Sequence, residues 1–158
     1  MTGIFSSTSP CWLVEKLEAD LQTLRARPRD PMTAFNFFVT AETLVDWLLP
    51  GNANRQARKN LRDHELLLQV VSHIASEAKH FVAEASHHKT VRSTKRTGGH
   101  FGGHLFAGGL FAGRLFFKGE MIVELDGDAA VKYGSQIGAL ALAELVMEKL
   151  NGLVAERT

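Results

Sequence analysis

Five ionisable side chains recur along one short stretch of the chain, at intervals of four, three, four and three residues. They are His73, Glu77, His80, Glu84 and His87. In an α-helix this spacing places all five side chains on one face, where residues three or four apart are neighbours. Imidazole and carboxylate groups in that arrangement could hold a metal ion, with His73, Glu77 and His80 as its ligands. The same spacing is also typical of the solvated flank of a packed helix.

The helix that would carry this row also has an apolar stripe with the same rhythm. Its members are Leu67, Val71, Ile74, Ala78, Phe81 and Ala85. The polar row is centred about 100° from the apolar stripe, at the boundary between core and solvent. The Glu-x-x-His pair found twice here is the unit of di-iron bundles, but those proteins take the two pairs from different helices. We therefore favour the solvated flank and expect no metal and no cofactor, with the site of His73, Glu77 and His80 kept as the alternative.

Three helices are predicted before residue 88. The first two begin with a capping residue followed by proline, a pair that favours the first turn of a helix. The capping pairs are Ser9 with Pro10 and Asp30 with Pro31. Apolar residues then recur at helical spacing, and the second helix is expected to end before a proline-glycine pair. The predicted helices cover about 10–27, 31–49 and 63–87.

The composition changes sharply after the third helix. No aspartate or glutamate occurs between Glu84 and Glu120, while six lysines and arginines do, which gives this segment a charge of +6 in a chain of net charge +1. A phosphate backbone is the natural partner of such a segment, and single-stranded nucleic acid stacks on phenylalanines interleaved with cations. The alternative is a solvated loop whose phenylalanines cover the core. The candidate nucleic-acid-binding residues are Lys89, Arg92, Lys95, Arg96, Arg114 and Lys118.

Two short strands and a last helix are predicted after the basic segment. The sequences RLFFKG and EMIVELDGD favour strands that pair as a hairpin near Gly119. Asp128 is expected to cap a closing helix that runs to about Ala155. This helix is apolar on nearly every side from Ile137 to Met147, so it lies at the centre of the fold or faces a partner chain. We name it as the expected surface for homo-oligomer formation.

These elements predict a mainly α fold, a bundle of about four helices with a small β-hairpin or Gly/Phe-rich loop inserted before the last helix. A length of 158 residues favours a single domain over 1–158. Its expected parts are a helical region at 10–87, the basic Gly/Phe-rich segment at 88–119, and a hairpin strand with the closing helix at 120–155.

The composition narrows the class of protein further. A chain that is 45% apolar and 22% charged is not disordered throughout. Its single cysteine, Cys11, excludes an internal disulfide and a zinc site built of several thiolates, which fits a reducing compartment. The first ten residues lack the positive charge and apolar run of a secretory signal, and the most apolar stretch is too short to span a membrane. We expect a cytoplasmic protein without membrane contact.

Several stretches of the chain resemble a known group of proteins. They are AFNFFVTAETLVDWLL, SEAKHF, the glycine- and phenylalanine-rich stretch, and ELDGD. Together they are similar to a scattered group of bacterial and phage proteins whose helical portion resembles the HEPN superfamily. The resemblance implies metal-independent cleavage of RNA by the arginine and histidine of an Arg-x(4 to 6)-His motif.

Arg58 and His64 meet the spacing of that motif, with five residues between them. Lys79 and His80 match the Lys-His-Phe motif of the group, while Ser76 stands where the group has asparagine. The resemblance therefore makes Arg58 and His64 the candidate catalytic pair of an endoribonuclease related to toxins or to defence.

Because no other catalytic motif is present, we predict a non-catalytic binding or assembly protein. Its basic Gly/Phe-rich segment is expected to contact RNA or a partner protein. The HEPN-type endoribonuclease is the alternative.

Overall fold

The computed structural model describes residues 9–80, 90–96 and 119–157 of the chain. Within these ranges lie six α-helices, one short 3-10 helix and a three-stranded antiparallel sheet. The prediction of a mainly helical fold with a small β element before the last helix is confirmed. In chain order the elements are α1 (Pro10–Ala26), α2 (Pro31–Leu48), η1 (Asn52–Asn54), α3 (Arg55–His64), α4 (Leu66–His80), β1 (Val91–Arg96), β2 (Met121–Leu125), α5 (Gly127–Tyr133), β3 (Gln136–Gly138) and α6 (Ala139–Ala155).

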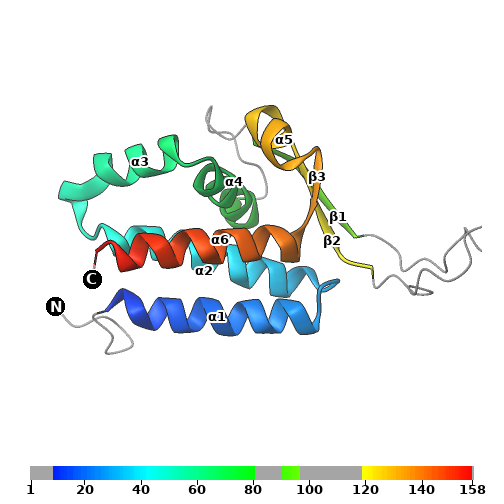
Figure 1. Ribbon diagram of the computed structural model, residues 1–158, viewed down its shortest axis with the longest axis horizontal. Coiled ribbons are helices and arrows are strands. Elements are labelled where there is room, and N and C mark those ends of the chain that lie inside the picture. The colour runs from blue at the N-terminus through cyan, green and yellow to red at the C-terminus, as the bar shows by residue number, and fades with distance from the viewer. Residues whose placement is uncertain (1–8, 81–89, 97–118, 158) are drawn as a thin grey trace, which may run out of the picture.

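Three long helices, α1, α2 and α6, run beside one another and form the body of the molecule (Figure 1). α4 packs across α2 and α6, and α3 leads into it along one side. The small sheet stands at one end of the three long helices, with its strands in the order β1-β2-β3 and α5 beside it (Figure 1). The sheet thus meets α2, α4 and α6 at that end.

The last helix lies at the centre of the core. It packs against α1, α2 and α4. Its buried side chains are Ala139, Leu142, Ala143, Val146, Met147, Leu150 and Leu153. The face of α6 that carries these side chains is therefore part of the core. Leu145, at 37% exposure, is the one large apolar side chain of α6 that counts as exposed in the described structure.

α1 and α2 begin where their capping pairs predict. Ser9 Oγ accepts a hydrogen bond from the Cys11 amide at 3.2 Å, and Asp30 Oδ1 accepts one from the Met32 amide at 2.9 Å. Each bond satisfies an N–H group that the first turn of a helix leaves without a partner. The two helices end within a residue of their predicted limits.

The region predicted as the third helix contains a break, and a helix before it was missed. α3 ends at His64, Glu65 takes an extended backbone, and α4 begins at Leu66 rather than near Asp63. No residue of α3 is buried, and its sequence RQARKNLRDH contains one large apolar side chain, Leu61. α3 therefore lacks the apolar periodicity by which the other helices were predicted.

The predicted closing helix from Asp128 is wrong in its first half. Asp126, not Asp128, caps α5, because its carboxylate accepts the Gly127 amide at 2.9 Å. α5 then ends at Gly134, whose φ of 88° lies in the left-handed region that favours glycine. The chain forms β3 before α6 begins at Ala139.

The strand EMIVELDGD is confirmed as β2, but residues 114–118 of its expected partner RLFFKG lie outside the described residues. In the described ranges β2 pairs with β1 on one side and with β3 on the other. β1 was expected to be part of a loop. Only its first residue, Val91, is buried, so pairing with β2 and not an alternating apolar pattern holds this strand in place.

Candidate functional site

His73 lies in a different environment from the one that its polar row predicts. The row was expected to be solvated, but the structure leaves only 3% of His73 exposed, so that prediction is wrong for this residue. Its Nδ1 atom accepts hydrogen bonds from the Val91 amide at 3.0 Å and the Thr90 amide at 3.3 Å. The physical reason is the return of the chain over α4, which brings the start of β1 onto His73.

These two hydrogen bonds define the tautomer of His73. A nitrogen that accepts from backbone amides carries no proton, so the ring proton lies on Nε2. Nε2 faces Oε1 of Glu77 at 3.4 Å, one turn further along α4. Because Nδ1 accepts from the Thr90 and Val91 amides, its lone pair is not available to a metal ion. Over the described ranges, no group of three His, Cys, Asp or Glu side chains is placed to hold one. The side chains of His80, Glu84 and His87 lie outside the described residues.

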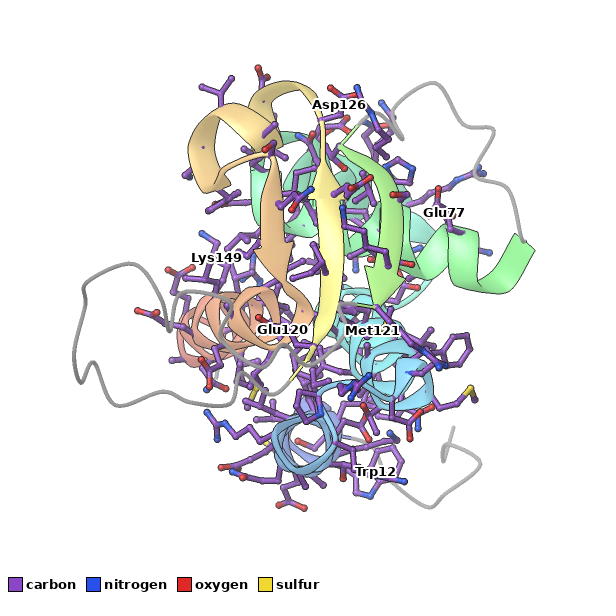
Figure 2. The ribbon with its side chains drawn as sticks, turned by 90° about the vertical axis from the view of Figure 1, so that its right-hand side faces the viewer. Trp12, Glu77, Glu120, Met121, Asp126 and Lys149 are labelled. Atoms are coloured by element: carbon purple, nitrogen blue, oxygen red, sulfur yellow. The ribbon has the colours of Figure 1, made fainter. Side chains whose placement is uncertain are left out.

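Glu77 stands at the wall of a groove of about 240 Å³ that opens where α2, α4 and the sheet meet. Figure 2 looks onto the sheet, with β1 at one edge, Glu77 beside it, and Met121 at the start of β2. The lining is mostly apolar, and its side chains include Phe35, Ile74, Met121 and Val123. Burial raises the pKa of the Glu77 carboxyl above its ordinary value of 4.5.

Replacing Glu77 by glutamine is expected to stabilise the protein at neutral pH. A carboxyl whose pKa is raised by folding favours the folded state below pH 4.5 and loses that contribution as the pH rises through its folded pKa. The contact between His73 Nε2 and Glu77 Oε1, at 3.4 Å, is too long to offset the cost of burying the charged carboxylate. Glutamine keeps a side-chain oxygen that can make the same contact. Because 35% of the side chain is exposed, the gain at pH 7 is expected to be below about 1 kcal/mol.

Thermal unfolding of wild type and Glu77→Gln at pH 4 and pH 7 measures this effect. The difference in Tm should be larger at pH 7. A variant that is less stable than wild type at pH 7 would show that the charged carboxylate stabilises the fold.

The hydrogen bonds of β1 show which of its backbone groups face the open edge of the sheet. The Asp126 amide donates to Thr90 O at 2.9 Å, so the backbone groups of Asp126 point toward β1. Backbone groups two residues apart in a strand point the same way, so those of Glu124 also point toward β1. Ser93, the partner of Glu124, therefore faces β2. Successive residues of a strand face opposite ways, so the amide and carbonyl of Thr94 point away from β2. No strand of the described chain pairs with β1 on that side.

Three of the six predicted nucleic-acid-binding residues lie on β1, and the other three, Lys89, Arg114 and Lys118, lie outside the described ranges. Arg92 pairs with Asp126 at 3.3 Å, and Lys95 pairs with Glu124. Arg96 is exposed and has no ion pair with any described residue. The structure thus brings three cations to one strand and places carboxylates of the same chain beside two of them.

The two carboxylates that face these cations are held in their charged form. Hydrogen bonds from Lys95 and Ser93 lower the pKa of Glu124, and the Gly127 amide together with Arg92 lowers the pKa of Asp126. Both pairs are exposed to solvent, where ion pairs stabilise little. Their main effect is on the local potential, because each offsets one positive charge of β1.

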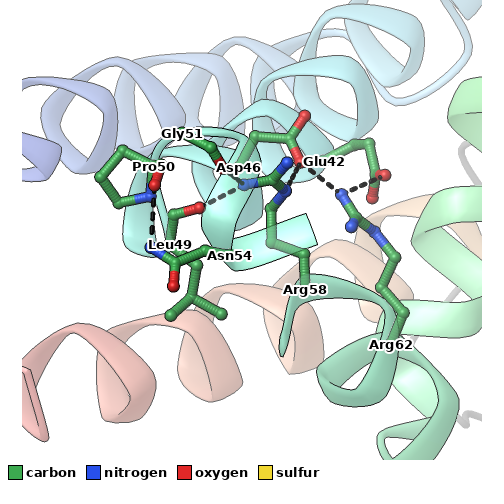
Figure 3. A network of polar contacts seen from close by, with 8 residues as sticks. All are labelled: Glu42, Asp46, Leu49, Pro50, Gly51, Asn54, Arg58 and Arg62. Carbon is green, nitrogen blue, oxygen red and sulfur yellow. Dashed lines mark hydrogen bonds and ion pairs between the residues drawn. The ribbon is translucent and has the colours of Figure 1, made fainter. Parts of the chain in front are cut away.

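The candidate catalytic pair of the HEPN resemblance is not assembled. Arg58 donates to the carbonyl oxygens of Leu49 and Gly51, the latter at 2.8 Å, and faces Asp46 (Figure 3). His64 Nδ1 instead contacts a carbonyl of its own helix, Asn60 O, at 2.7 Å. Six residues along a helix turn the two side chains about 120° apart. Arg58 therefore closes the end of α2 and does not share a site with His64.

Of the other residues that the resemblance names, Ser76 is partly buried on α4, and the side chains of Lys79 and His80 lie outside the described residues. RNA cleavage stays a prediction from the resemblance.

Arg62 completes a network of polar contacts between α3 and α2. Its guanidinium lies 2.7 Å from Glu42 and 2.8 Å from Asp46 (Figure 3). Burial lowers the pKa of Arg62 while the facing carboxylates raise it, and the net shift is upward. This network was not predicted, because its acidic and basic members come from different helices.

The groove residues Phe35, Thr94 and Met121 were not among the predicted site residues. Phe35 belongs to the apolar pattern of α2 but is 38% exposed, since the groove opens beside it. The groove arises where three elements meet, so no spacing along the chain marks it. The β-branched residues of VRSTKR were the one local signal for the strand at its rim.

Over the described ranges, none of the helices has the length and apolar character needed to cross a membrane. A comparison with family models, curated proteins and solved structures finds no match to this chain.

Proposed function

We propose that this chain is a non-catalytic binding protein, and that β1 together with the basic Gly/Phe-rich segment at 88–119 is its contact surface. The observation that carries the proposal is the exposed edge strand with Arg92, Lys95 and Arg96, which lies beside an open apolar groove. Carboxylates of the same chain offset Arg92 and Lys95, so Arg96 and the other cations of the segment at 88–119 give this surface its positive potential. That potential attracts negatively charged macromolecules by long-range electrostatics. The ligand is therefore anionic, either RNA or an acidic protein.

An anion-binding assay tests this proposal. A labelled single-stranded RNA and a labelled polyglutamate are titrated with the protein between about 50 and 200 mM salt, where affinity should fall steeply as salt rises. Changing Arg92, Lys95 and Arg96 to glutamine together is expected to weaken binding of at least one ligand by about tenfold or more.

A matched variant controls for net charge. Glutamine at Arg55, Lys59 and Arg157 removes three exposed cations at the end of the molecule away from the sheet. It is expected to leave affinity within about twofold of wild type, since distant exposed charges are screened at these salt concentrations. An equal loss in both variants, or binding of neither ligand, would contradict the proposal.

We also propose self-association as a secondary property, with α6 as the surface. Its support is limited to the exposed Leu145, because the other large apolar side chains of α6 pack within the chain. Light scattering tests it: a mass of twice 17.4 kDa supports self-association, and a mass of 17.4 kDa contradicts it.

A further inference from the structure

We infer that the open edge of β1 and the groove beside it bind an extended peptide that carries an apolar residue and a carboxylate two positions apart. The inference rests on the proposed function, in which β1 is the contact surface, and names the class of ligand. Three features of the described residues support it: the backbone groups at the edge, the shape of the groove, and the charge at the end of the strand.

The first feature is the backbone of β1. Thr94 directs its amide and carbonyl away from β2, so both can pair with an added strand. At the start of the strand the situation differs, because His73 accepts the Val91 amide at 3.0 Å. His73 therefore takes the place of a neighbouring strand at Val91, where the edge is buried, and the backbone groups of Thr94 stay open to an added strand. Addition of a strand to such an edge is a common mode of peptide recognition.

The second feature is the groove. Thr94 lies opposite Val123, and both residues line the groove, so this face of β1 looks toward α2 and α4. A strand added beside β1 would direct every second side chain toward the same face. The volume of about 240 Å³ and the walls of Phe35, Ile74 and Met121 suit one apolar side chain of leucine size.

The third feature is charge. Arg96 lies opposite Met121 on the groove face, two residues beyond Thr94, and has no ion pair with any described residue. A carboxylate two residues from the apolar side chain of the peptide would lie beside it. A second copy of β1 is disfavoured as the occupant, because cations on an edge strand repel an identical strand. The outward amide and carbonyl of Thr94 offer both a donor and an acceptor, which suits a peptide backbone better than the phosphates of RNA, since a phosphate has no N–H to donate.

Two labelled octapeptides of the same composition test the inference. Both contain one leucine and one glutamate in a background of threonine. In the matched peptide the glutamate and the leucine are two residues apart, so that both can face the groove. It is made in both sequence orders, because an added strand can run either way along β1, and the tighter order is compared with the control. In the control peptide the two residues are adjacent and must point to opposite faces. Fluorescence anisotropy is expected to show binding of the matched peptide at least about tenfold tighter than that of the control.

Two variants of the protein test the edge and the charge separately. Thr94→Pro removes the outward N–H of the edge without removing a hydrogen bond to β2, a place where edge strands tolerate proline. Arg96→Glu reverses the exposed charge. Each is expected to weaken binding of the matched peptide at least about tenfold. The control variants Thr94→Val and Arg96→Lys are expected to bind it with wild-type affinity. Thermal unfolding checks that each variant is folded. If Thr94→Pro does not fold, Arg96→Glu alone tests the inference.

The outcomes separate this inference from the proposed function. Equal affinity for the two peptides, or wild-type affinity of folded Arg96→Glu, overturns the inference. The absence of peptide binding up to about 1 mM also overturns it, because such an affinity is too weak for recognition. If single-stranded RNA binds instead and depends on Arg96, the proposed function stands and the inference falls. If neither ligand binds, both fall. Dimerisation that Thr94→Pro abolishes would assign the edge to a second copy and would overturn the inference.

Discussion

His73→Ala is expected to lower the free energy of unfolding by about 3 kcal/mol. The substitution removes the acceptor of two amides, Val91 and Thr90, in a place where both residues are buried. A buried donor that loses its acceptor costs more than the hydrogen bond itself contributes, because water does not replace the partner. The loss also detaches the start of β1 from α4, so the edge strand should become less ordered. Chemical denaturation followed by circular dichroism measures the change.

Two further variants separate the lost acceptor from the lost volume. His73→Leu fills the site with an apolar side chain and is expected to destabilise nearly as much as alanine does, because the two amides remain without an acceptor. His73→Asn places an oxygen close to the position of Nδ1 and should lose only about 1 kcal/mol. If His73→Leu proves as stable as wild type, the hydrogen bonds to β1 do not hold the strand in place.

Arg62→Ala should produce the second large loss of stability, about 2 kcal/mol. The guanidinium is 18% exposed and lies between the carboxylates of Glu42 and Asp46. Removing it takes this ion pair from Glu42, which is only 13% exposed, while Asp46 still faces Arg58 at 3.4 Å. Because α3 buries no residue of its own, this network is a major attachment of α3 to α2.

Lys59→Ala is the matched control for Arg62→Ala. Lys59 lies on the same helix and pairs with Asp63 at 3.2 Å, but it is 65% exposed. Its loss is expected to change stability by less than about 0.5 kcal/mol. Urea denaturation of both variants provides the comparison. Equal effects would mean that the contacts of Arg62 stabilise no more than an exposed ion pair does.

The sequence predicts those parts of the fold that local chemistry determines. The starts of α1 and α2 follow from a capping side chain beside a proline, and the central place of α6 follows from its apolar surface. α3 and β1 could not be predicted in this way, because each is held mainly by residues distant in sequence. Arg62 ties α3 to α2, and β2 pairs with β1.

The candidate site also has parts that the sequence predicts and parts that depend on the packing of distant segments. The charge of the basic segment is a property of composition, so the sequence alone identifies Arg92, Lys95 and Arg96. The carboxylate partners of Arg92 and Lys95, and the groove, depend on how distant segments pack, and no local pattern predicts them. His73 is the clearest case, because its regular spacing predicts a solvated residue and the return of the chain buries it.

The central claim is that ligands bind at the edge of β1. An NMR titration with the single-stranded RNA and with the matched peptide tests it most directly, through the backbone amide signals. The account predicts that the amides of Thr94 and Arg96 shift progressively with at least one of the two ligands, while those of α3 stay in place. Shifts confined to α3, around Arg58 and His64, would contradict it and would favour the site implied by the HEPN resemblance.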